Sequence, residues 1–510
     1  MIGKKIFKNT LMLYSRQILL IFISLYTFRV VLNVLGIEEY GVFTVVAGIV
    51  MLCSFLTSSM SSATQRFFSF ALGKKDEKLL KSTFSVNLVI YAGIGILVLA
   101  LLEGGGLWFV NNHLDIPPER RSSAILLYHY TALSFLFAVI TAPFRAIIIA
   151  HEDMHYFAIV SIIEALMKLA IVFVLLYLPW DKLELYGILL LGVSIITAIM
   201  HIIICMYKYP ECQFRKLYWD KSLVQEIFHF TSWTLLGQIS TVARFQAVTI
   251  LLNQFFTPSV VAARAISVTV SSQVNLFSNN FNTGLYPSII KSYARKDEKE
   301  LFLLLFNGSK LTFFLMWVFV LPLLLEMNTV LKLWLNIVPE QAVLFTKLAL
   351  IESLIFSISL PIATAARAPG KMKRYELTLA VMQLGIFAIC YLVLEMGYPA
   401  FSVFVVAIII NVFMFAARLS IVSKLIGLPI KTFIQTVCIP VVLVMLTSTL
   451  PAVAMSYIMP VGIGYSILNV AWCIFISTVS MYYIGLDPVW RKRIREFIVN
   501  KFKVFLGGIR

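Results

Sequence analysis

Fourteen apolar segments dominate this chain, and each is close to the length needed to cross a membrane. The hydrocarbon core of a bilayer is about 30 Å thick, so a spanning helix needs about 20 mostly apolar residues. Lipid offers no partner for backbone N–H and C=O groups, which favours helices over open strands. The pattern therefore predicts an all-α, multi-pass membrane protein. The expected spans are 11–35, 41–63, 84–110, 124–150, 157–179, 186–207, 226–253, 260–289, 302–325, 343–366, 376–395, 399–420, 433–457 and 462–484.

The charge distribution supports this topology and argues against a soluble protein. Only 13% of the residues are charged and the mean hydropathy is +0.91, whereas soluble domains have about 25% charged residues. Of the 42 Lys and Arg residues, 31 fall in segments on one side of the expected spans and four on the other. Basic residues gather on the cytoplasmic side of membrane proteins. We therefore expect both termini in the cytoplasm, and we interpret the net charge of +17 as a topology signal and not as a nucleic-acid surface.

Two pairs of loops repeat along the chain. The string KDEK occurs at 75–78 and again at 296–299, and PFRAIIIAHEDMHY at 143–156 matches PIATAARAPGKMKRY at 361–375. Both copies start on the same side of the membrane, so the repeat is expected to be parallel, about an axis along the membrane normal. We expect two pseudo-symmetric six-helix lobes, two extra helices and a basic amphipathic cytoplasmic tail. The predicted divisions are 1–220, 221–432, 433–484 and 485–510.

The stretch HEDMH at 151–155 fits H-E-x-x-H, in which two histidines on one helix hold zinc and the glutamate acts as general base. This pattern raises the alternative of a membrane zinc protease. Its counterpart in the second half reads PGKMK, which retains no metal ligand, and the stretch lies in a short turn between two expected spans. We therefore interpret HEDMH as a solvated polar turn. No C-x-x-C pair is present, and no metal, cofactor or catalytic residue is predicted.

A polar row runs along the eighth expected span. Its members follow spacings of three and four, which places them on one face of a helix; they are Arg264, Ser267, Ser271, Asn275, Ser278 and Asn282. Such a row cannot face lipid cheaply. Packing of small residues against a neighbouring helix is one explanation, but asparagine and arginine are bulky for that role. The row therefore favours a water-filled cavity.

Charged residues within the expected spans indicate what this cavity binds. Charges deep in a membrane usually line cavities or pair with one another, and the deep set is net basic, which favours a phosphate, a diphosphate or an acidic sugar. Lys168 follows Glu164 by four residues and is also explained as its salt-bridge partner. Glu164 and Glu352 are candidates for binding a coupling ion. The candidate substrate-binding residues are Arg29, Arg244, Arg264, Lys310, Lys168, Asn275 and Ser271.

Three stretches resemble bacterial O-antigen and polysaccharide flippases. They are SRQILLIFISLYTFRVVLNVLGIEEYGVF, SSMSSATQRFFSFALGKKD and FTSWTLLGQIS. These flippases belong to the superfamily that also holds multidrug-and-toxin extruders and lipid II flippases. The resemblance implies alternating access between two lobes in the bacterial cytoplasmic membrane. It also implies an undecaprenyl-diphosphate-linked anionic oligosaccharide as substrate, with a polysaccharide polymerase and glycosyltransferases as candidate partners.

The resemblance leaves a second transporter class open. Drug extruders of the superfamily usually carry an acidic residue in their first helix for cation coupling, whereas the first expected span here carries Arg16 and Arg29 and no acid. This departure counts against a cation-coupled multidrug exporter. The sequence thus predicts a transporter and not an enzyme, with the drug exporter and the zinc protease as alternatives.

Overall fold

The computed structural model describes residues 2–51, 53–113, 117–213, 218–335, 338–460, 462–487 and 491. Within these ranges the chain forms helices and no strand. Thirteen helices are long and apolar enough to cross a membrane, and a bent pair formed by Glu39–Val50 and Ser54–Lys74 raises the number to 14. The predicted all-α multi-pass fold is therefore confirmed. The predicted tail helix lies almost entirely outside the described residues.

The helices divide between two compact units, each with its own buried core. The first unit comprises 1–239, 283–298 and 370–376. In it α5 packs against α2, α3 and α7, and α1 packs against α6. Its helices and short turns are α1 (Ile2–Met51), α2 (Ser54–Lys74), α3 (Glu77–Leu101), η1 (Leu102–Gly106), α4 (Leu107–His113), η2 (Pro118–Arg120), α5 (Arg121–Ala150), α6 (Met154–Tyr177), α7 (Lys182–Lys208), η3 (Pro210–Cys212) and the first part of α8 (Lys221–Phe255).

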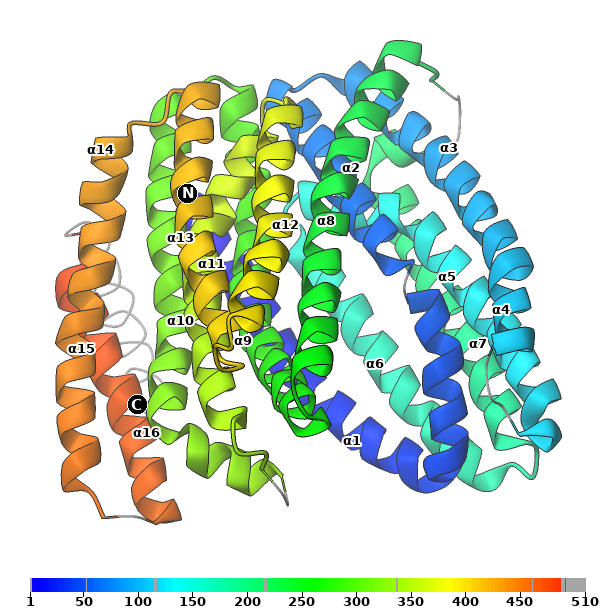
Figure 1. Cartoon of the computed structure of the whole chain (residues 1–510). Helices are drawn as coiled ribbons and strands as arrows, with labels where there is room; N and C mark the ends of the chain where they lie inside the picture. The colour runs from blue at the N-terminus through cyan, green and yellow to red at the C-terminus, as the bar shows by residue number, and fades with distance from the viewer. Residues whose placement is uncertain are drawn as a thin grey trace, which may run out of the picture. The chain divides into compact units, whose positions relative to one another are not determined.

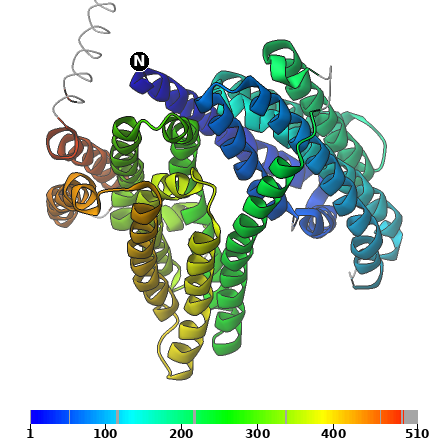
Figure 2. The ribbon, with the colours of Figure 1, turned by 90° about the horizontal axis from the view of Figure 1, so that it is seen from above.

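The second unit comprises 240–282, 299–369 and 377–510. Within it, α15 and α16, drawn in orange and red, lie beside each other and next to the green α10 (Figures 1 and 2). The Trp317 indole of α10 donates to Ser448 of α15 at 2.8 Å. Four helices contribute residues to both units: α8, α9, α12 and, by its first residue Glu298 alone, α10. The remaining elements are α9 (Pro258–Ala294), α10 (Glu298–Trp334), α11 (Ala342–Arg367), α12 (Lys373–Glu395), α13 (Ser402–Ile426), α14 (Ile430–Phe433), η4 (Ile434–Cys438), α15 (Ile439–Ile458), α16 (Ile463–Ser480) and η5 (Met481–Gly485).

The loop repeat seen in the sequence recurs in the backbone. Lys75 and Lys296, the first lysines of the two KDEK strings, both have left-handed φ angles, 56° and 59°. Glu152 and Gly370 occupy matching places in the second pair of loops and have φ angles of 64° and 78°. Left-handed backbone is uncommon outside glycine, so its recurrence at both matched pairs shows that these loops share a conformation as well as a sequence pattern. The two-lobe division itself stays a prediction.

The second expected span, 41–63, is not one straight helix. Its two parts meet at an angle of 47°. Before it, α1 is broken at Gly36, whose φ of 78° and ψ of 170° are not helical. Glycine adopts this conformation without the steric cost that a Cβ would add. Hydropathy detects the apolar stretch, but it carries no information about this bend.

Candidate functional site

A cavity of about 230 Å³ lies within the second unit. Each contributing helix presents residues spaced three or four apart, so each offers one face to the cavity. The faces belong to α8, α9, α11, α12 and α13, and the polar lining residues are Thr241, Arg244, Arg264, Ser271, Asn275, Glu352, Ser353, Gln383 and Asn411. Five of the nine residues predicted as binding or coupling residues therefore lie together: Arg244, Arg264, Ser271, Asn275 and Glu352.

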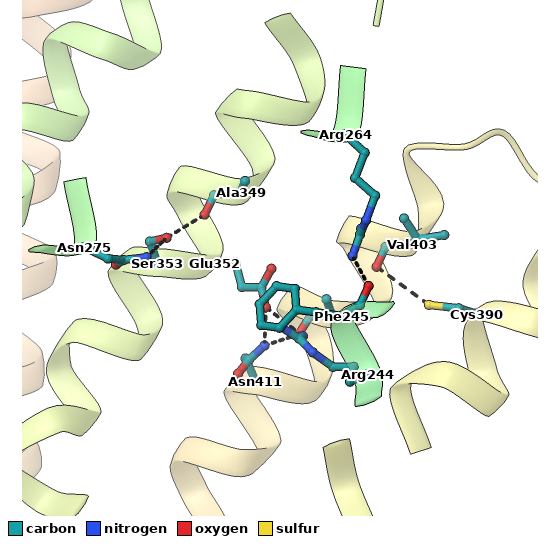
Figure 3. A network of polar contacts seen from close by, with 11 residues as sticks. Arg244, Phe245, Arg264, Asn275, Ala349, Glu352, Ser353, Cys390, Val403 and Asn411 are labelled. Carbon is teal, nitrogen blue, oxygen red and sulfur yellow. Dashed lines mark hydrogen bonds and ion pairs between the residues drawn. The ribbon is translucent and has the colours of Figure 1, made fainter. Parts of the chain in front are cut away.

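An ion pair crosses the cavity between α8 and α11. Arg244 Nη1 lies 2.9 Å from Glu352 Oε1, and Asn411 Nδ2 of α13 donates to the same oxygen at 3.0 Å (Figure 3). The Arg244 guanidinium also lies over the Phe245 ring, 4.2 Å from its centroid. Both side chains of the pair are largely buried, at 6% and 17% exposure. Arg244 is therefore held in place and its charge is compensated.

Arg264 lines the same cavity without such compensation. It is 7% exposed, and its Nε donates to the Thr249 hydroxyl at 3.0 Å while Nη2 donates to the Phe245 carbonyl at 3.3 Å. No carboxylate among the described residues pairs with it. A buried charge without a counter-charge is costly in a low-dielectric site. The Arg264 guanidinium is therefore the main positive centre of the cavity.

Asn275 is oriented by its neighbours on α11. The Ser353 hydroxyl donates to the Ala349 carbonyl at 2.9 Å, so it must accept the hydrogen bond from Asn275 Nδ2 at 3.0 Å (Figure 3). The Asn275 amide oxygen is buried and has no hydrogen-bond partner among the described residues. Thr241 and Ser353 also line the cavity although the sequence did not predict them as site residues, and neither Gln383 nor Asn411 was predicted. A single amide in an apolar span gave little reason to single out either residue.

The other four predicted residues do not line this cavity. Lys310 of α10 is 3% exposed and contacts Asp487 Oδ1 at 3.1 Å. Lys168 contacts Glu164 at 2.7 Å along one face of α6, and both side chains are partly exposed. This contact is the salt bridge that the i,i+4 spacing allows. Arg29 is exposed on α1.

The HEDMH turn separates its two histidines instead of aligning them. Helix α5 ends at Ala150 and α6 begins at Met154, so the stretch is not on one continuous helix, as a zinc-binding H-E-x-x-H requires. His151 Nε2 lies 2.6 Å from Glu211 Oε1, and Glu152 contacts Lys291 at 2.8 Å. No three His, Cys, Asp or Glu side chains in the described ranges are placed to hold a metal.

The turn is also less solvated than the sequence suggested, since His151, Glu152 and Asp153 are all partly buried. Asp153 accepts a hydrogen bond from the Tyr209 hydroxyl at 2.8 Å and contacts Lys208 at 3.2 Å. Burial disfavours the charged carboxylate, but these two contacts outweigh it and hold the pKa of Asp153 below its usual value. Burial, followed by the bond to Asp153, raises the pKa of Tyr209. The turn is thus closed by side-chain contacts within the first unit.

Comparison with known proteins points to one family. The sequence model of a polysaccharide biosynthesis protein family matches residues 6–264. A relative from Bacillus subtilis (strain 168), the uncharacterized membrane protein EpsK, is 20% identical over 283 residues. That match spans 56% of this chain and 56% of the relative's length.

Solved structures of similar fold are transporters. An outward-facing multidrug resistance MATE family transporter of the MOP superfamily superposes with a TM-score of 0.69 at 11% identity, covering 82% of this chain and 96% of the other. A MOP superfamily transporter from Pyrococcus furiosus, described as having a binding pocket of reversed polarity, gives a TM-score of 0.66 at 12% identity, with the same coverage. At these identities the similarity establishes the fold.

Proposed function

Because the chain belongs to the polysaccharide biosynthesis protein family, we propose that it flips an anionic, lipid-linked oligosaccharide across the bacterial cytoplasmic membrane by alternating access. The cavity of the second unit binds an anionic group of this substrate, while the polyprenyl tail stays in lipid. Both termini face the cytoplasm, following the distribution of Lys and Arg. Glycosyltransferases that supply the substrate and a polymerase that consumes it are the proposed partners.

The observation that carries this proposal is the uncompensated charge of Arg264. The guanidinium is 7% exposed, and its neighbours are a hydroxyl and a carbonyl instead of a carboxylate. A planar guanidinium fork matches the oxygens of carboxylates and phosphates in a bidentate fashion. An anionic ligand supplies the missing counter-charge, and so it binds this cavity more favourably than a cation of the same size.

One observation favours the alternative of a multidrug exporter. The Glu352 carboxylate faces the cavity, and its second oxygen, Oε2, has no hydrogen bond among the described residues. A cationic drug would find a negative group there. It would also have to lie beside Arg264 and Arg244, and two positive neighbours outweigh one negative neighbour. The cavity as a whole therefore supports the anionic substrate.

The test is transport by the full-length protein in liposomes. Flipping of a labelled polyprenyl-diphosphate oligosaccharide is compared for the wild type, Arg264→Gln and Arg264→Lys. We expect Arg264→Gln to lower the flux at least tenfold, because it removes the uncompensated charge. Arg264→Lys should retain an intermediate flux, because it keeps the charge and loses the fork.

The matched control is Arg418→Gln on α13. Arg418 is buried to the same degree as Arg264, at 8% exposure, but it does not line the cavity, so its flux should stay close to that of the wild type. Equal flux in Arg264→Gln and the wild type would refute the proposal. Efflux of a cationic dye by the wild type, with no flipping of the oligosaccharide, would establish the exporter instead.

A further inference from the structure

The unpaired polar atoms of the cavity describe a ligand that donates hydrogen bonds as well as accepting them. Three buried side-chain atoms of the described lining have no partner: Arg244 Nε, Asn275 Oδ1 and Gln383 Oε1. Two of the three are acceptors. The contact of Asn275 Nδ2 with Ser353 assigns the two ends of that amide and leaves Oδ1 as the acceptor without a partner. Buried polar groups are normally satisfied, so a ligand that fits this site brings O–H or N–H groups to Asn275 and Gln383.

The charges of the described lining sum to a single positive charge. Arg244 and Glu352 form a contact pair at 2.9 Å and cancel each other. Among the described lining residues, Arg264 remains as the one cation without a carboxylate contact. A ligand with one negative charge balances the site. A ligand with two or more negative charges would bring the excess charge next to the Glu352 carboxylate. In a largely buried site, like charges repel strongly.

We propose that this cavity selects a singly charged acidic sugar, a hexuronate within the oligosaccharide, and that the Arg244–Glu352 pair limits the charge that it accepts. This inference rests on the proposed function and specifies its substrate. Arg264 binds the sugar carboxylate, and Asn275 Oδ1 and Gln383 Oε1 accept hydrogen bonds from ring hydroxyls. Glu352 acts as a specificity-determining residue, because it neutralises Arg244 and faces the ligand with its free oxygen.

The diphosphate of the lipid carrier fits the same cavity poorly. An ionised diphosphate carries more than one negative charge and offers acceptors without donors, so it leaves the Asn275 and Gln383 oxygens unsatisfied. The volume of about 230 Å³ also lies below the roughly 300–1,000 Å³ of pockets for drug-sized ligands. It suits one sugar ring better than a longer segment of the substrate. The diphosphate is therefore bound outside this cavity.

The experiment uses calorimetry to compare how tightly the purified full-length protein binds three probes: glucuronate, glucose and pyrophosphate. The wild type should bind glucuronate at least tenfold more tightly than either of the other two. Glu352→Gln should raise the affinity for pyrophosphate about tenfold, because Arg244 becomes a second uncompensated cation. Glu395→Gln, which changes an exposed carboxylate on α12, should leave the order of the three probes unchanged.

Gln383→Leu tests the contribution of the sugar hydroxyls to binding separately from that of the carboxylate. It should weaken the binding of glucuronate about tenfold, equivalent to about 1.4 kcal/mol. The binding of acetate should be unchanged, since acetate has a carboxylate and no hydroxyl. Tighter binding of pyrophosphate than of glucuronate by the wild type would overturn the inference. Arg264-dependent flipping without any preference for glucuronate would overturn it too, yet leave the proposed function standing. Flipping that does not depend on Arg264 would remove both.

Discussion

Two turns occupy equivalent places in the repeat, the turn at 151–153 between α5 and α6 and the turn at 368–372 between α11 and α12. Both contain one residue with left-handed φ, Glu152 at 64° and Gly370 at 78°. At Glu152 the strain is offset by the side chain, which contacts Lys291 at 2.8 Å, while the carbonyl accepts a hydrogen bond from Asn9.

Gly370 has no side chain, and the space that a Cβ would fill is needed by a neighbouring residue. A Cβ at Gly370 would lie 2.6 Å from the guanidinium of Arg66, which is 4% exposed and paired with Glu226 at 3.2 Å. The left-handed conformation is therefore stabilised by a side-chain contact at Glu152, and it is tolerated at Gly370 because glycine has no Cβ. The comparison teaches that HEDMH is one of two solutions to a turn geometry, and that its resemblance to a zinc motif is separate from its role in the fold.

Of the substitutions in these two turns, replacing Glu152 should cause the largest loss of stability. Glu152→Ala keeps the left-handed backbone and removes a largely buried carboxylate from Lys291, at 11% and 18% exposure for the two side chains. We expect a loss of about 2–3 kcal/mol of stability. Glu152→Gly loses the same contact but relieves the backbone strain, so it should lose about 1 kcal/mol less. Thermal unfolding in detergent measures both, and equal losses for the two variants would show that the left-handed φ carries no cost.

Filling the space at Gly370 should have the next largest effect. Gly370→Ala adds left-handed strain of about 1 kcal/mol and displaces Arg66, which also lies over the Phe230 ring at 5.4 Å. We expect a total loss of about 2 kcal/mol. Gly397→Ala is the matched control, because Gly397 has a φ of 82° and nothing within 4 Å of the added Cβ. Unfolding curves compare the two variants, and an equal loss would show that Arg66 moves aside without cost.

Much of the architecture followed from the sequence, because spans depend on local properties. Apolar length gives the spans, and the spacing of Arg264, Ser271 and Asn275 gives the helix face that meets the cavity. These quantities depend on residues a few positions apart, and helix geometry relates such residues directly. The repeated loops were visible for the same reason, since short strings such as KDEK determine a turn locally.

The pairing of charges between different helices did not follow, because it depends on which helices are neighbours. Arg244 meets Glu352 from a distance of 108 positions, and Lys310 meets Asp487 from 177 positions. Lys310 was therefore placed among the cavity residues, although its partner lies after the last helix. Arg66 was not singled out at all, because an arginine at the end of an apolar segment is ordinarily solvated, whereas here aromatic rings and Glu226 cover it.

The smallest predicted effect concerns the pH dependence of the HEDMH turn. The hydrogen bonds from Tyr209 and Lys208 hold the pKa of Asp153 below its ordinary value of 3.8. The folded state therefore binds this proton less readily than the unfolded chain, so the stabilisation is present above pH 3.8 and is lost as the pH falls through the lowered pKa. Asp153→Asn should flatten the fall in unfolding temperature between about pH 5 and pH 3. The second half of the repeat has no acid in its turn, so this contribution belongs to the first turn alone. Glu340→Gln, which changes an exposed carboxylate, controls for net charge; if it flattens the profile as much as Asp153→Asn does, the Asp153 contacts are not the source.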